Sequence, residues 1–149
     1  MELKSLLVDS KTTWVEFPGL DGFEVELANL SRKELVALRK KCTNNKFNRK
    51  TRAFEESLDE DKFLVEFTAA TVKGWKGLKL KFLEDLLLAD VSKQDIENEL
   101  PFTDENAKVL VENSSEFDNW LNEVVFDLEN FRTDFKGKAK GETRPVAES

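Results

Sequence analysis

The sequence predicts a mainly α fold, a single small helical domain over residues 1–135 with an N-terminal β-hairpin at about residues 12–28. A disordered, flexible tail is expected over residues 136–149. Three observations predict this organisation: two extended apolar segments near the N-terminus, helix-capping patterns before apolar stripes, and a polar last segment with nothing to bury. A chain of 149 residues is long enough for one core and too short for two large domains.

The first predicted element is the β-hairpin. Residues 13–17 are rich in aromatic and β-branched side chains, and residues 23–27 alternate strictly between apolar and acidic side chains. Residues 18–22 between them are typical of turns. Because an isolated two-stranded hairpin is marginally stable in water, we expect its second strand to pack against helices or against a strand of a neighbouring subunit. The side chains concerned are Phe23, Val25 and Leu27.

A capping box at Ser31 and Glu34 predicts the first helix, because each residue can bond the backbone amide of the other. We expect this helix to end near residues 43–45. The basic connector that follows, up to Arg52, is compatible with a loop or with a short helix. Residues 57–60 repeat the capping-box pattern and predict a second helix, which Gly74 ends.

The later elements are predicted from spacing. Residues 75–78 are expected to break regular structure, residues 78–82 alternate like a short strand, and residues 83–88 can form one or two helical turns. Thr103 is the predicted N-cap of the next helix, and residues 113–115 are expected to interrupt that helix and to cap the following one. Apolar side chains then recur at helical spacing from residue 117 to Phe135, which predicts an amphipathic last helix. The three tryptophans are expected in the core: Trp14, Trp75 and Trp120.

The composition excludes several classes of enzyme. There is no histidine, which removes histidine-dependent nucleophiles and histidine metal sites. The single cysteine, Cys42, cannot form an internal disulfide or a multi-cysteine metal site. The carboxylates between Glu55 and Asp61 are almost consecutive, as at a solvated helix N-terminus, and do not come from separate segments as a catalytic pair does. The sequence therefore predicts no enzymatic activity, no cofactor and no metal site.

The formal net charge of −7 is unevenly distributed. Residues 39–52 contain seven basic side chains and no acidic one, whereas most of the remaining chain is acidic. A basic segment on an acidic body favours head-to-tail self-association or an oppositely charged partner over nonspecific binding to nucleic acid. We therefore expect a homo-oligomer or a protein partner, and no nucleic acid. The basic side chains expected to contact acidic faces of a sister subunit or client are Arg49, Lys50 and Arg52.

Twelve phenylalanines and several consecutive leucines supply more apolar surface than a few short helices need. We expect part of it to form a contact surface for a protein partner, with contributions from Trp75, Leu78, Phe82, Leu86 and Leu87. No segment approaches the roughly 18–20 uncharged apolar residues of a membrane-spanning helix. We therefore expect no membrane association and a location in the cytoplasm.

A series of short motifs carries a resemblance to a known family. In chain order they are Trp14 to Pro18, Leu30 to Leu35, Gly74 to Leu78, Pro101 to Asn106, and Ser114 to Trp120. In this order and spacing, over roughly residues 12–132, the chain resembles the tail assembly chaperones of long-tailed bacteriophages. The resemblance implies a non-enzymatic factor of the host cytoplasm that is absent from the mature virion. It implies binding to the tape measure protein, which is kept soluble, and recruitment of tail tube protein.

Three other functions remain open at this level. A minor structural or tail completion protein of the virion is the alternative nearest to the chaperone. An acidic inhibitor of a host nucleic-acid enzyme would use the acidic body of the chain, but the basic segment opposes it. A metal-dependent carboxylate enzyme is the least favoured, because the carboxylates do not converge from separate segments.

Overall fold

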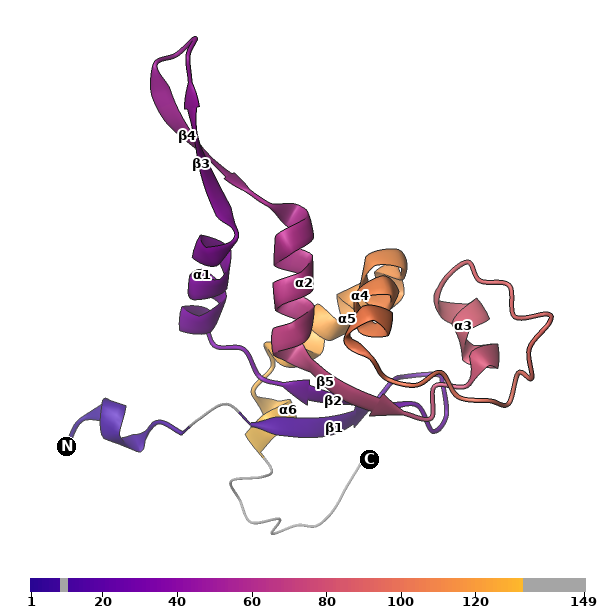
Figure 1. Cartoon of the computed structure of the whole chain (residues 1–149). Helices are drawn as coiled ribbons and strands as arrows, with labels where there is room; N and C mark the ends of the chain where they lie inside the picture. The colour runs from indigo at the N-terminus through magenta and orange to yellow at the C-terminus, as the bar shows by residue number, and fades with distance from the viewer. Residues whose placement is uncertain (9–10, 133–149) are drawn as a thin grey trace.

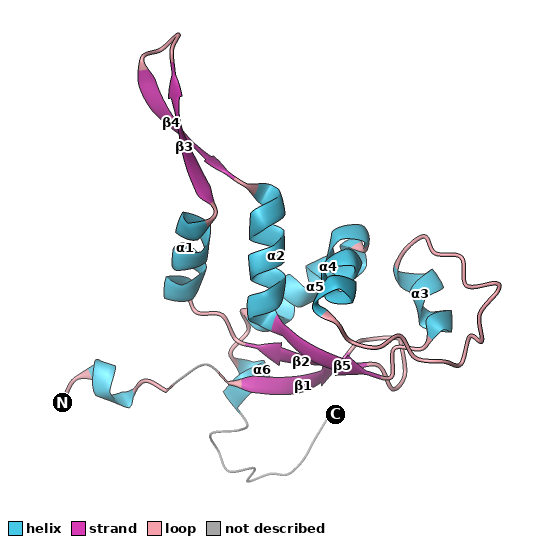
Figure 2. Ribbon diagram, in the orientation of Figure 1, coloured by secondary structure: helices cyan, strands magenta, loops and turns pink. Residues whose placement is uncertain are grey.

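The computed structural model describes residues 1–8 and 11–132 and has an α+β fold (Figure 1). Helices account for 45% of it and strands for 22%, so the predicted mainly α class is wrong. The strands form a three-stranded and a two-stranded antiparallel sheet (Figure 2). The sequence patterns miss three of the described strands, which either pair with a distant segment or have no buried face. The predicted tail, residues 136–149, lies outside the described residues.

The three-stranded sheet contains β1 (Thr12–Glu16), β2 (Glu24–Ala28) and β5 (Val72–Lys76), in the order β1-β2-β5. The first two strands confirm the predicted N-terminal hairpin. At the centre of the sheet, Val25 lies opposite Val15 on one side and opposite Trp75 on the other. The hairpin side chains expected to be buried are completely buried, against helices of the same chain: Phe23, Val25 and Leu27.

Strand β5 follows α2 (Glu60–Thr71) without an intervening residue. The helix therefore ends at Thr71 and not at Gly74, and β5 replaces the irregular segment that the sequence predicts from Trp75 onward. The register between β2 and β5 shifts between Glu26 and Leu27. Such an irregularity interrupts the alternation of inward and outward side chains, which is the local pattern by which a strand is recognised.

Helices α2, α4 (Asp104–Asn113) and α5 (Ser115–Val125) cover one face of this sheet (Figures 1 and 2). Aromatic rings fill the space between the helices and the sheet. The ring of Phe117, which is fully buried, lies 6.0 Å from that of Phe17 and 6.4 Å from that of Phe23, measured between centroids. The indole Nε1 of Trp75 donates a hydrogen bond of 2.9 Å to the carbonyl of Leu100, which satisfies the polar atom of a buried ring.

The opposite face of the sheet carries polar side chains. Lys76 forms an ion pair of 3.6 Å with Glu24, and its Nζ lies 4.7 Å from the centroid of the Trp14 ring. Trp14 is 44% exposed, because alternate residues of β1 point inward and Trp14 is not one of them. The prediction that Trp14 belongs to the core is therefore wrong. Trp75 is buried in the core as predicted, and Trp120 is half-buried and packs against the core.

The predicted N-caps Ser31 of α1 (Arg32–Lys41) and Thr103 of α4 are confirmed. The cap predicted within residues 113–115 is Ser114, which caps α5. At Ser31 the capping box with Glu34 is complete. The predicted position of the second N-cap, Ser57, is wrong by two residues. Asp59 caps α2 by accepting a hydrogen bond of 3.1 Å from the Lys62 amide, because Ser57 already belongs to a strand.

The predicted last helix is divided in two. α5 ends at Val125, and α6 (Glu129–Arg132) follows after a short turn. The carbonyl of Val125 accepts hydrogen bonds from the Leu30 amide (3.3 Å) and from the side chain of Asn29 (2.9 Å), which lies 96 residues earlier in the chain. These distant donors satisfy a helix-terminal carbonyl. Phe135, the last position of the predicted stripe, lies outside the described residues.

The remaining helical segments lie at the edges of the molecule (Figure 1). A single 3-10 turn, η1 (Leu3–Leu6), precedes β1, and α3 (Leu80–Leu86) follows β5. α3 replaces the short strand predicted for residues 78–82. A long connection returns along the start of α3, where the amides of Leu80 and Lys81 donate to backbone carbonyls of residues 98 and 96 at 2.8 and 3.1 Å.

Candidate functional site

A two-stranded arm projects from one end of α1 and α2, away from the three-stranded sheet (Figure 1). It consists of β3 (Thr43–Asn48), β4 (Ala53–Leu58) and the loop between them, and is called the arm below. The strands pair in continuous register from Thr43 opposite Leu58 to Asn48 opposite Ala53. The arm therefore replaces the loop or short helix that the sequence allows for the basic connector.

The loop at the end of the arm is held by hydrogen bonds to the side chain and the backbone of Asn48. The Oδ1 of Asn48 accepts from the amides of Lys50 (2.8 Å) and Thr51 (3.3 Å), and the Asn48 carbonyl accepts from the amide of Arg52 at 2.7 Å. Arg52 has a φ of 58°, a left-handed backbone conformation that favours glycine. The turn is thus well defined, although one of its residues is strained.

The structure brings the three predicted basic residues together in this loop. The side chains of Arg49, Lys50 and Arg52 are all exposed, and they are called the basic tip below. None of them forms an ion pair with a carboxylate of the described residues. The arm therefore ends in a compact group of positive charges that has no counterion in its own chain, as far as the chain is described.

Behind the basic tip lies a pair of exposed phenylalanines. Phe47 and Phe54 are directly opposite each other in the strand register, and their rings meet edge to face with centroids 5.4 Å apart. They are 54% and 74% exposed, respectively. Cross-strand aromatic pairs stabilise a hairpin, but this pair leaves most of its apolar area in water. It is the most prominent accessible apolar feature of the arm.

The base of the arm is attached to both neighbouring helices. Cys42, which is buried, is the only residue between α1 and β3, and its carbonyl accepts a hydrogen bond of 2.8 Å from the Asp59 amide. Lys41 at the end of α1 pairs with Glu66 of α2 at 2.8 Å. This hydrogen bond and the nearby negative charge of Glu66 raise the pKa of Lys41 above its ordinary value.

Relief of the backbone strain at Arg52 should stabilise the arm. We expect Arg52→Gly to slow amide hydrogen exchange in β3 and β4 roughly fivefold, because a left-handed conformation costs a non-glycine residue about 1–2 kcal/mol and glycine loses part of this gain in chain entropy. Arg49→Gly is the control, since its φ is not positive and it should not slow exchange. If both substitutions changed the exchange rates equally, the backbone conformation of Arg52 would not contribute to the stability of the arm.

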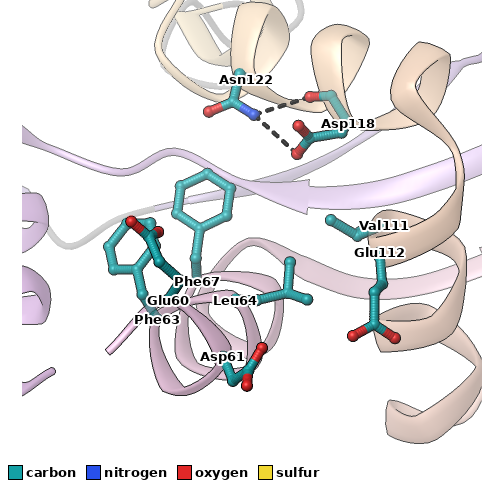
Figure 3. Close-up of a pocket in the computed structure, with 9 residues that line it drawn as sticks. All are labelled: Glu60, Asp61, Phe63, Leu64, Phe67, Val111, Glu112, Asp118 and Asn122. Atoms are coloured by element: carbon teal, nitrogen blue, oxygen red, sulfur yellow. Dashed lines mark hydrogen bonds between the residues drawn. The ribbon is translucent and has the colours of Figure 1, made fainter. Parts of the chain in front are cut away.

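A second feature is a groove of about 460 Å³ between α2, α4 and α5 (Figure 3). Its apolar lining consists of Phe63, Leu64, Phe67 and Val111, and its polar lining of Glu60, Asp61, Glu112, Asp118 and Asn122. The four carboxylates come from three helices, and none is in an ion pair with a cation of the described residues. Asp118 accepts a hydrogen bond from Asn122 at 3.1 Å within the groove. We call this site the acidic groove.

The apolar residues predicted for a contact surface lie mainly inside the molecule. Trp75, Leu78 and Leu86 are buried in the core, and Phe82 and Leu87 are half-buried against it. They border the core beneath α3 and its returning connection and do not form an accessible surface together. The sequence patterns above do not predict a role for Phe47, Phe54 or the acidic groove. The symmetric placement of the two phenylalanines about the turn is the signal in the sequence that indicates a hairpin.

No group of three or more His, Cys, Asp or Glu side chains within residues 1–8 and 11–132 is arranged to hold a metal ion. In the same ranges, no helix combines the length and apolar character needed to cross a bilayer.

The arrangement of the arm and the acidic groove suits contact with another polypeptide, through exposed aromatic rings and unpaired charges of both signs. In comparisons with known proteins, no family model, curated protein sequence or solved structure matches this chain.

Proposed function

We propose that this chain is a tail assembly chaperone of a long-tailed bacteriophage. On this proposal it binds the tape measure protein in the host cytoplasm, keeps it soluble and helps to recruit tail tube subunits. It performs no catalysis and is not part of the mature virion. The order of the short motifs supports this class of protein, and the arm supports the way in which it would bind its client.

The observation that carries the proposal is the exposed pair Phe47 and Phe54 on an arm that stands clear of the core (Figure 1). A protein that binds a long hydrophobic client needs apolar side chains that the client can reach. It also needs charge near the contact, so that the complex stays in solution. The arm presents both, because the basic tip begins two residues after Phe47 and ends two residues before Phe54.

The test is co-expression with the tape measure protein of the same phage. We expect the full-length chain to move the tape measure protein into the soluble fraction, and Phe47→Ser combined with Phe54→Ser to weaken that complex at least about tenfold. Burial of each exposed ring is worth about 1.5–3 kcal/mol, and 1.4 kcal/mol corresponds to a factor of ten. The readouts are the soluble fraction and the affinity of the purified complex.

The matched control is Leu88→Ser, which removes a fully exposed apolar side chain outside the arm. It should leave both readouts unchanged, and the global thermal unfolding of all variants should be similar because none of the three side chains is buried in the core. An insoluble tape measure protein in the presence of the unaltered chain would contradict the proposed function. If the double variant bound the tape measure protein as tightly as the unaltered chain does, the arm would not be the client-binding site.

A further inference from the structure

The arm and the acidic groove of this protein are chemically complementary. The basic tip supplies three positive charges, and the aromatic pair behind it supplies exposed apolar surface. The acidic groove supplies four carboxylates around an apolar floor. Neither set of charges has a counterion among the described residues. Unlike charges that meet across an apolar contact give an interface both attraction and specificity.

One aromatic ring that lines the groove already contacts a cation of its own chain. The guanidinium of Arg39 lies 5.4 Å from the centroid of the Phe63 ring, which lines the groove. Cations are attracted to the face of an aromatic ring, and the attraction increases when water is excluded. The remaining rings and carboxylates of the groove thus offer the same chemistry to the basic tip of another molecule.

The position of the groove relative to the arm decides which molecule's arm can reach it. Its residues Glu60 and Asp61 are the first two of α2, and only Asp59 separates them from the end of β4, so the groove lies at the base of the arm. The tip of the arm lies about 20 Å from this base, since β4 has six residues and a strand rises about 3.3 Å per residue. An arm that points away from its own groove cannot reach it, so a basic tip placed in the groove would have to belong to a second molecule (Figure 1).

We propose that two copies of this chain exchange arms around a two-fold axis, each placing its basic tip and aromatic pair in the acidic groove of the other. If the tip of one arm reaches the base of its partner, two-fold symmetry makes the reverse contact at the same time. The two arms then run antiparallel beside each other, which brings together sheet edges that have no partner strand among the described residues. The inference goes beyond the proposed function: in such a dimer the aromatic pair is covered, so the partner's groove and a client would compete for the same arm.

The test uses two charge-reversal variants of the full chain. The tip variant carries Arg49→Glu and Lys50→Glu, and the groove variant carries Asp61→Lys and Glu112→Lys. We expect the unaltered chain to show twice its mass of 17.1 kDa by light scattering, and each variant alone to dimerise roughly tenfold more weakly or worse. A 1:1 mixture of the two variants should regain the dimer mass, because each reversed tip then meets a reversed groove.

A control variant carries Glu84→Lys and Glu123→Lys, which make the same change in net charge as the groove variant but at exposed positions outside the groove. It should dimerise like the unaltered chain. A mixture that stays monomeric, or an unaltered chain that is monomeric at all concentrations, would overturn the proposal. Masses that grow beyond the dimer would overturn the reciprocal arrangement and indicate open head-to-tail chains. The groove variant keeps its arm intact, so its client binding reports on the proposed function separately.

Discussion

Phe117→Ala should destabilise the folded state by about 3–5 kcal/mol, the cost of truncating a fully buried phenylalanine. The Phe117 ring lies among those of Phe17, Phe23 and Trp120, with centroids between 5.6 and 6.4 Å away, and joins α5 to the hairpin beneath it. The cavity left by the substitution would remove contacts of α5 with the hairpin and contacts within α5. For a chain of this size, the melting temperature should fall by about 10 °C.

Urea unfolding followed by circular dichroism measures this change directly. Phe126→Ala is the matched control, because Phe126 lies just after the end of the same helix but is 40% exposed. We expect a loss of only about 1 kcal/mol there, because the half-exposed ring of Phe126 has a contact with the Phe67 ring to lose but leaves no closed cavity. Similar losses at the two positions would show that the stacked rings around Phe117 do not form the centre of the core.

Gly77→Ala should have the next largest effect. Gly77 has a φ of 77°, and a Cβ atom on it would overlap the backbone carbonyl of Gly22, which cannot move like a flexible side chain. The left-handed conformation alone costs alanine about 1–2 kcal/mol. The overlap adds about 1–3 kcal/mol, as for other substitutions that overfill a packed site. The loss should be measured as the change in the free energy of unfolding.

Gly19→Ala separates these two contributions. Gly19 has a φ of 88°, but a Cβ atom there would have no neighbour within 4 Å. Its substitution should cost only the conformational penalty, so the difference between the two variants measures the close approach of the chain at Gly77. If both variants lost the same free energy, the backbone near residue 22 would have to move aside at little cost.

The sequence predicts best those features that depend on neighbouring residues. The caps at Ser31, Thr103 and Ser114 follow from side chains that bond amides three residues away. The N-terminal hairpin likewise pairs residues close in the chain, and its alternation is regular because one face is buried. In these elements a single short window of sequence contains both partners of each interaction.

The missed elements depend on information outside such a window. β5 pairs with β2, which lies almost fifty residues earlier, and the end of α5 depends on donors at Asn29 and Leu30. The arm is missed for another reason, because its strands are exposed on both faces and therefore show no apolar alternation. The predicted contact surface around Trp75 and Leu78 fails as an accessible surface because apolar composition alone does not distinguish a core from an exposed patch.

The two joints at the base of the arm have a mechanical consequence. Cys42 and Asp59 are the only residues between the arm and the helices, and a hydrogen bond ties one to the other. On the outgoing side the chain runs from β4 through α2 into β5 with no flexible linker. The orientation of the arm relative to the helices is therefore nearly fixed. Most of the arm's orientational entropy is lost when the chain folds, and little is left to lose when the arm binds a partner.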